Sequence, residues 1–168
     1  MLDDPEAHVR ATVAALGVDH EVVDCDPELA DTALFVEHYG YALEDSANTI
    51  VVMGKADPPK FVACVVLAHT RLDVNKTVRK RLGVRKCSFA PADATRELTG
   101  MEIGGVTPFA LPDDLEIWVD GRVMQRDRIV LGGGSRSCKV VGVPELLTAL
   151  PRVTVIEDLA LEIAESAP

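Results

Sequence analysis

The sequence predicts an α/β protein of the α+β type, in which helices flank a mixed, barrel-like β-sheet. Apolar β-branched segments are interspersed along the chain with segments of helical periodicity. Two of the apolar segments, 49–53 and 61–68, are joined by a loop rich in Gly and Pro, which is typical of an antiparallel hairpin. Such a hairpin fits a mixed sheet better than a doubly wound parallel sheet.

We expect one domain covering residues 1–168, because no linker, repeat or low-complexity segment divides the chain. An apolar content of 48% argues against disorder. No apolar run approaches the length of a membrane span, so we expect no membrane partner. The segment MLDDPEAHVR is acidic, unlike a secretory signal, and a cytoplasmic protein is expected. The apolar strands would also be compatible with a homodimer.

The four cysteines are scattered, and none forms a CxxC pair. Three of them lie in apolar stretches, which favours small core residues over metal ligands. The histidines also lack the spacing of metal ligands. We therefore expect no metal and no cofactor. The cysteines are Cys25, Cys64, Cys87 and Cys138.

Helices are predicted from caps, stop signals and apolar periodicity. Asp4 caps the first helix, Pro5 occupies its first position, and Gly17 stops it. Asn75 is expected to cap the third helix, whose valine and leucine side chains recur on one face. The predicted helices are 5–16, about 32–40, 76–82, 91–98 and 144–150, with a brief helical turn at 43–47.

Strands are predicted where apolar and β-branched residues cluster between turn signals. The hairpin segments are continuously apolar, so we expect both faces of the hairpin to be buried. The predicted strands are 20–24, 49–53, 61–68, 86–89, 115–119, 128–131, 138–141 and 153–156.

The net charge of −10 is unevenly distributed. Residues 1–50 contain twelve acidic residues and one arginine, whereas residues 71–86 contain seven basic residues and one aspartate. The basic segment therefore carries a net charge of +6. This pattern indicates a protein that contacts a polyanion over a small area, although a solvated helix face would have the same composition.

The stretch 98–112, LTGMEIGGVTPFALP, combines three glycines with two prolines. Gly104 and Gly105 can adopt a positive φ and let the backbone approach a ligand, while Pro108 fixes the chain nearby. Exposed amide groups in such a loop can bind carbonyl, carboxylate or phosphate oxygens. The alternative is a wide turn between two strands without chemistry.

The chain contains no GxSxG, Walker, HExxH or dinucleotide-binding motif in a suitable context. The GGGS segment at 132–135 is followed by a predicted strand, which argues against a phosphate loop. Glycine loops, hydroxyls and amides remain as the available groups. If the protein is an enzyme, we expect it to act by positioning the substrate and stabilising an oxyanion.

Several segments together resemble the YbaK/prolyl-tRNA-synthetase-associated family of aminoacyl-tRNA editing domains. They are TIVVMGK, RLDVNKTVRKRLGVRK, ATRELTGMEIGGVTPF, VDGRV and GGGSRSCKV, and the resemblance covers about residues 12–160. It implies a mixed, barrel-like sheet with helices and a free-standing deacylase. Such an enzyme hydrolyses the ester of a mischarged aminoacyl-tRNA, often of the proline tRNA.

The resemblance also implies roles for individual residues. The GxxxP loop from Gly104 to Pro108 would hold the ester carbonyl, and a substrate or tRNA hydroxyl would help to activate water. Within it, the amides of Gly105, Val106 and Thr107 would bind the carbonyl oxygen. We assign substrate binding to Thr32, His69, Asp120 and Ser135, and tRNA contact to Arg71, Lys76, Arg79 and Lys80. Asp120 also fits a simple Asp-Gly turn.

One position departs from the family pattern. Many members have a lysine before the first long strand, where this chain has Asn48. Asparagine forms hydrogen bonds but carries no charge, and Lys55 and Lys60 lie too far along the strands to replace the lysine. We therefore expect Asn48 at the catalytic site with altered specificity or weakened hydrolysis. The alternative function is a non-catalytic protein that binds an amino-acid-like ligand or a tRNA end.

Overall fold

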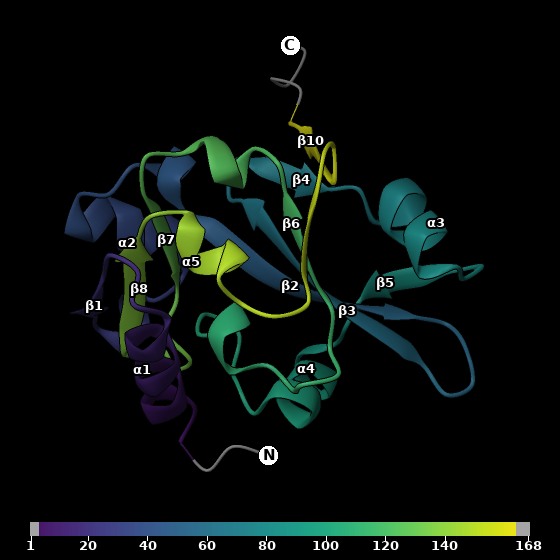
Figure 1. The fold of residues 1–168 in the computed structure, drawn as a ribbon, viewed down its shortest axis with the longest axis horizontal. Helices are drawn as coiled ribbons and strands as arrows, with labels where there is room; N and C mark the ends of the chain where they lie inside the picture. The colour runs from purple at the N-terminus through teal and green to yellow at the C-terminus, as the bar shows by residue number, and fades with distance from the viewer. Residues whose placement is uncertain (1–3, 164–168) are drawn as a thin grey trace.

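The computed structural model describes residues 4–163, whose strands form three separate sheets (Figure 1). The orders are β1-β8-β7, β10-β4 and β5-β2-β3-β6-β9. The largest sheet is mixed, because β3 pairs in parallel with β6 and β6 with β9, whereas β2 is antiparallel to β3 and β5. The strands are β1 (His20–Asp24), β2 (Ala47–Gly54), β3 (Lys60–Leu67), β4 (Thr70–Leu72), β5 (Cys87–Phe89), β6 (Ile117–Asp120), β7 (Ile129–Gly132), β8 (Cys138–Gly142), β9 (Val153–Ile156) and β10 (Ala160–Glu162).

Helices lie around these sheets, and most are short. Helix α1 begins as expected, with the Asp4 side chain accepting a hydrogen bond from the amide of Ala7 and with Gly17 in the left-handed conformation at its end. The helices are α1 (Pro5–Leu16), α2 (Thr32–Tyr39), α3 (Arg79–Leu82), α4 (Ala92–Thr99) and α5 (Glu145–Thr148). Shorter helical turns are η1 (Pro27–Leu29), η2 (Leu43–Asp45), η3 (Val74–Val78), η4 (Pro108–Ala110) and η5 (Val123–Gln125).

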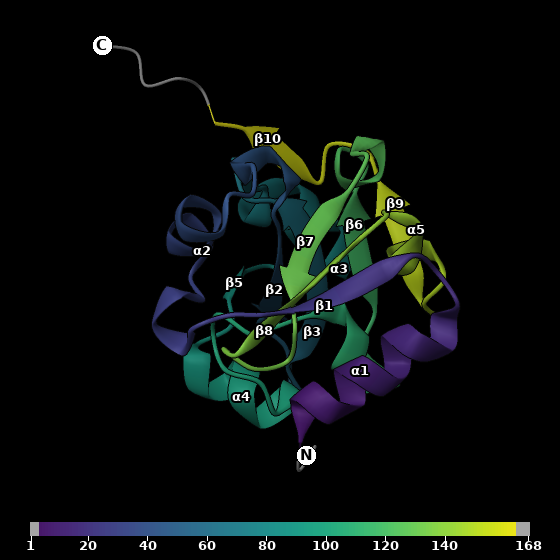
Figure 2. The same ribbon diagram turned by 90° about the vertical axis from the view of Figure 1, so that its left-hand side faces the viewer.

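The main core lies between the five-stranded and the three-stranded sheet. Figure 2 shows β1, β8 and β7 in front of the larger sheet. Val65 and Val119 of the larger sheet belong to the same buried cluster as Leu131 and Val140 of the smaller one. Helices α1 and α5 add apolar side chains to this cluster. Burial of this apolar surface fixes how the two sheets are placed.

The outer face of the three-stranded sheet is covered by α2. Phe35 of α2 packs against Val130 of β7 and Val141 of β8 in a smaller cluster. Side chains alternate between the two faces of a strand, so Lys139 shares this face with Val141 rather than pointing into the main core. This alternation brings a lysine to the side of the sheet on which α2 lies.

Most predicted elements are confirmed, and the mixed α+β class with them. The hairpin is formed by β2 and β3, and side chains of β3 enter buried clusters on both of its faces. The described strands do not close into a barrel, because they divide into three sheets. Strands β4 and β10, which pair with each other, were not predicted. Each has three residues, too few for a period-two pattern to stand out.

The third helix begins earlier than predicted. Asp73, not Asn75, precedes it, and the chain first forms the π-helical turn η3 before continuing as α3. The Asp73 carboxylate accepts a hydrogen bond from the Thr77 hydroxyl at 2.8 Å, which stabilises this start. The predicted apolar face is confirmed, since Val78 is buried and Leu82 packs beside it.

The cysteines occupy the core as expected. Cys25, Cys64 and Cys138 are buried and Cys87 is half-buried, all as free thiols. Burial raises the pKa of the Cys138 thiol to about 11, so this thiol is protonated at neutral pH. Within residues 4–163, no helix combines the length and the apolar character that crossing a membrane requires.

Candidate functional site

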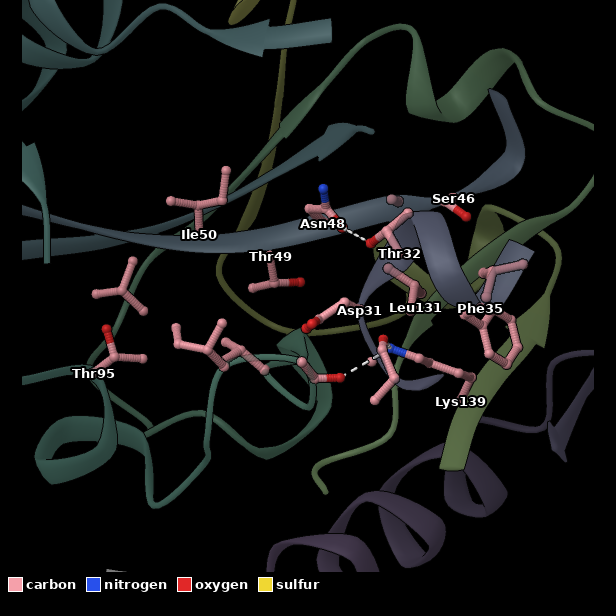
Figure 3. A pocket seen from close by; sticks show the side chains of 18 of the residues that line it. Asp31, Thr32, Phe35, Ser46, Asn48, Thr49, Ile50, Thr95, Leu131 and Lys139 are labelled. Atoms are coloured by element: carbon pink, nitrogen blue, oxygen red, sulfur yellow. Dashed lines mark hydrogen bonds between the residues drawn. The ribbon is translucent and has the colours of Figure 1, made fainter. Parts of the chain in front are cut away.

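A pocket of about 370 Å³ lies beside the outer edge of β2 (Figure 3). On this side β5 pairs with Val52–Gly54, the Ala90 amide donates to the Val51 carbonyl, and Ser46 forms an isolated bridge to Val130 of β7, so among the described residues no strand pairs with the segment 47–50 at this edge. The other walls are the start of α2, the β7 and β8 strands, and residues 103–106, which we call the glycine turn. The lining residues are Ala30, Asp31, Thr32, Phe35, Ser46, Ala47, Asn48, Thr49, Ile50, Val51, Phe89, Ala90, Thr95, Ile103, Gly104, Val106, Val130, Leu131, Gly132 and Lys139.

Hydroxyl and amide groups from two elements meet at this pocket. The Thr32 hydroxyl at the start of α2 donates a hydrogen bond of 2.9 Å to the Asn48 side-chain oxygen of β2. The Thr49 hydroxyl is inaccessible to solvent and has no hydrogen-bond partner among the described residues. In Figure 3 the Thr49 side chain points from β2 into the pocket, on the side of Asp31. A buried hydroxyl without a hydrogen-bond partner is costly to the folded protein.

Lys139 is the buried cation of the site, with a relative exposure of 6%. Its ammonium group donates to the carbonyl oxygens of Ala30 at 2.6 Å and Gly104 at 2.9 Å. It also lies 5.6 Å from the centroid of the Phe35 ring. Burial lowers the pKa of Lys139 below its ordinary value of 10.5. Lys139 was not among the residues predicted from the sequence. A lysine within the apolar strand CKVVG is the pattern that indicates it.

Arg136 makes a second connection between the same two walls. Its guanidinium donates to the carbonyl of Ile103 at 2.8 Å and to the Asp31 carboxylate at 3.1 Å. It also donates to the carbonyl of Pro27 at 3.0 Å. Lys139 and Arg136 therefore both tie the chain before α2 to the glycine turn. This pair of cations fixes the width of the pocket.

The glycine turn has the conformation that its sequence suggests. Gly104 has a φ of 97°, which favours glycine. The amide of Gly105 donates to the carbonyl of Glu102 at 2.9 Å, so this amide is already occupied within the turn. Among the hydrogen bonds of residues 4–163, none is donated by the amides of Gly104, Val106 or Thr107. Gly104 and Val106 line the pocket.

Thr107 and Pro108 lie behind the turn rather than in the pocket lining. Both are buried, and the Thr107 hydroxyl has no hydrogen-bond partner among the described residues. The structure thus brings Gly104, Val106, Asn48 and Thr32 together at one pocket, while Gly105, Thr107 and Pro108 support the turn from outside the lining.

Three other predicted substrate residues lie outside the pocket. His69 is exposed at the turn between β3 and β4. Asp120 is fully buried, pairs with Arg122 at 3.3 Å and accepts a hydrogen bond from the amide of Ala160. The Ser135 hydroxyl donates to Glu6 at 2.9 Å and joins α1 to the loop before β8. The contacts of Asp120 and Ser135 hold elements of the fold together.

The predicted tRNA-contacting residues lie on neighbouring elements. Arg71 is exposed on β4, Lys76 and Lys80 are exposed on η3 and α3, and Arg79 is half-buried. The Arg79 guanidinium donates to the carbonyl of Asn75 at 2.8 Å, within its own helical segment. In Figure 1, α3 stands beside β5, at the edge of the larger sheet. These residues form a basic surface near the open side of β2.

We predict that the contribution of Lys139 to stability depends on pH. Its pKa is lower in the folded protein than in the unfolded chain, so the folded protein releases this proton first as the pH rises. The free energy of unfolding of the wild type, minus that of Lys139→Met, should therefore increase between neutral pH and about pH 10.5. Urea denaturation of both proteins across this range measures the difference. A difference that stays constant or decreases would contradict a lowered pKa of Lys139 in the folded protein.

Several known proteins are similar to this chain in sequence or in fold. The Bacillus subtilis (strain 168) protein YwhH, described as uncharacterized, is 26% identical over 140 residues, which cover 83% of this chain and 87% of YwhH. The crystal structure of a candidate trans-editing enzyme for prolyl tRNA synthetase has a TM-score of 0.79 at 21% identity, covering 97% of this chain and all of that one. The hypothetical protein APE2540 has a TM-score of 0.77 at 25% identity, covering 88% and 97%.

The sequence profile of the aminoacyl-tRNA editing domain matches residues 26–150. This segment contains the open edge of β2, the glycine turn and Lys139, and so includes the walls of the pocket. The fold and the profile agree over most of the described residues. The chain therefore belongs to the aminoacyl-tRNA editing domain family.

Proposed function

We propose that this protein is a free-standing deacylase that hydrolyses the ester bond of a mischarged aminoacyl-tRNA. The observation that carries the proposal is the glycine turn, where the amides of Gly104 and Val106 have no hydrogen-bond partner within residues 4–163 and lie beside a pocket of about 370 Å³. Unused amide donors at a pocket wall are suited to binding a carbonyl oxygen that becomes negatively charged. Membership of the editing family supports the same reaction class.

The proposed reaction is the attack of water on the ester carbonyl carbon. The carbonyl oxygen becomes an oxyanion, which the amides of Gly104 and Val106 stabilise. The bond between the carbonyl carbon and the ribose oxygen then breaks, and the proton lost by the water is passed to the ribose oxygen, which leaves a free amino acid and an uncharged tRNA. Among the described residues that line the pocket there is no histidine or cysteine, and the Asp31 carboxylate is paired with Arg136, so a hydroxyl of the tRNA or of the substrate is proposed to carry this proton.

The contact of Lys139 with the glycine turn supports this proposal. Its hydrogen bond to the Gly104 carbonyl fixes the peptide that joins Gly104 to Gly105, next to the proposed oxyanion site. The pocket therefore contains a cation, although Asn48 stands where the family resemblance leads us to expect a lysine. We propose that Asn48 and Thr32, which are hydrogen-bonded to each other, contact the aminoacyl group instead.

The proline tRNA is the first candidate substrate. The related structure described as a candidate trans-editing enzyme for prolyl tRNA synthetase motivates this choice. Pocket discrimination by size alone is weak, since one methylene is worth only about 1–3 kcal/mol.

We predict that the wild type deacylates at least one member of a panel of mischarged tRNAs that includes alanyl- and cysteinyl-tRNA(Pro). Gly105→Ala should reduce the rate about 100-fold, because an added Cβ would lie 2.7 Å from the backbone of Ser135 and displace the turn. Release of the amino acid from radiolabelled tRNA measures the rate.

Gly54→Ala is the matched control for this variant. Its added Cβ would lie 2.7 Å from the end of the Leu82 side chain and 3.0 Å from Val84, which are side-chain atoms away from the pocket rather than backbone, so it should retain activity. An unchanged rate in Gly105→Ala would contradict the role of the turn. Binding of the tRNAs by the wild type without any hydrolysis would favour the alternative function, a non-catalytic binding protein.

We also predict that Lys76→Glu combined with Lys80→Glu weakens tRNA binding and makes its salt dependence shallower, because fewer phosphate contacts release counterions. Both side chains are exposed, so the fold should be retained. Filter binding at several salt concentrations measures the slope. Hydrolysis of a small aminoacyl ester provides the control and should stay at the wild-type rate. Equal affinity and slope in both proteins would exclude this surface.

A further inference from the structure

Phe89 is an exposed aromatic residue at the last position of β5, with 55% of its surface accessible. It pairs across the ladder with Val52 of β2, at the point where the open edge of β2 begins. Phe89 lines the pocket described above. It also lines a second hollow of about 390 Å³. Phe89 is therefore shared by the two hollows.

The second hollow differs from the pocket in its chemistry. Its polar lining comes from β4, η3 and β5 and includes Arg71, Asn75 and Ser88, all of which are exposed. Asp73 also lines it, and the Asp73 carboxylate accepts the hydrogen bond from Thr77. Apolar contacts are available from Leu161, which is 41% exposed. A cation, an amide and a hydroxyl close to an aromatic residue suit a ligand in which a planar, polar group is joined to a negatively charged group.

The order of these features follows the chain of an aminoacyl-tRNA. Phe89 joins the pocket, which contains Gly104 and Val106 of the glycine turn, to the hollow with Arg71, and η3, which carries part of the basic surface, also lines that hollow. An aminoacyl-tRNA presents an amino acid, a terminal base, and then phosphates in the same order. Exposed Ile103, at 56%, lines the pocket and adds a further apolar side chain near the entrance.

We infer that Phe89 is the stacking platform for the terminal base of the tRNA, and that the hollow beside it receives the adjoining sugar and phosphate. This inference rests on the proposed function, since it concerns the same substrate. Single-stranded nucleic acid ends are commonly bound by stacking of unpaired bases on aromatic side chains. Arg71 supplies a charge for the phosphate, and Asn75 and Ser88 supply hydrogen bonds.

The test uses the full-length protein and an uncharged RNA minihelix of the proline acceptor stem, which carries 2-aminopurine as its terminal base. Stacking quenches the fluorescence of this base. Binding to the wild type should quench the emission, and Phe89→Tyr should retain the effect because it keeps the ring. Phe89→Ala should abolish the quenching and weaken binding about 5- to 150-fold, the range expected for one stacked base. Leu34→Ala, at an apolar position on α2 that is 45% exposed, should bind as the wild type.

The outcomes separate this inference from the proposed function, because the RNA carries no ester. Quenching that depends on Phe89 supports the inference even if no mischarged tRNA is hydrolysed. Equal quenching and affinity in Phe89→Ala would overturn the inference while leaving the deacylase proposal standing. Failure of the wild type to bind the minihelix would overturn the inference, whereas the deacylase proposal stands or falls on hydrolysis of the mischarged tRNAs. Urea denaturation of each variant verifies that the exposed position has been changed without loss of the fold.

Discussion

The pocket depends on two cationic side chains from the same part of the chain. Lys139 joins the carbonyl of Ala30 to that of Gly104, and Arg136 joins Asp31 to the carbonyl of Ile103. Each side chain thus crosses from the start of α2 to the glycine turn. Hydrogen bonds from charged donors are the stronger ones, typically worth about 1.5–3 kcal/mol net. They act together with the Thr32–Asn48 hydrogen bond, which holds the start of α2 against β2, and with the Gly134 amide, which donates to the Gly105 carbonyl of the turn.

The contacts of Lys139 also explain how the pocket contains a positive charge although Asn48 carries none. Asn48 forms a neutral hydrogen bond with Thr32, whereas the cation enters from β8 on the opposite wall. A buried lysine is favourable only when carbonyl oxygens compensate for its lost hydration, and Lys139 has two. The positive charge is therefore directed at the backbone of the turn. In this account it stabilises the proposed oxyanion site indirectly, by fixing the peptide next to it.

The sequence predicted the regular elements well because they are local. The Asp4 cap, the Gly17 stop and the apolar runs of β2 and β3 each lie within a few residues of the structure that they specify. The pocket is harder to predict, because its walls come from segments about 100 residues apart. In the sequence, Lys139 has the pattern of an ordinary strand residue, because only the folded structure brings α2 over it. Asp120 and Ser135 fitted a family pattern, but their contacts are long-range and lie within the fold.

The most direct test of this account is a crystal structure with a non-hydrolysable aminoacyl-adenosine, in which an amide replaces the ester. We predict that the aminoacyl group occupies the pocket near Thr49 and that its carbonyl oxygen accepts a hydrogen bond from the amide of Gly104 or Val106. Lys139 should keep its contact with the Gly104 carbonyl. An analogue bound elsewhere, or bound in the pocket with its carbonyl directed away from the glycine turn, would contradict the central claim.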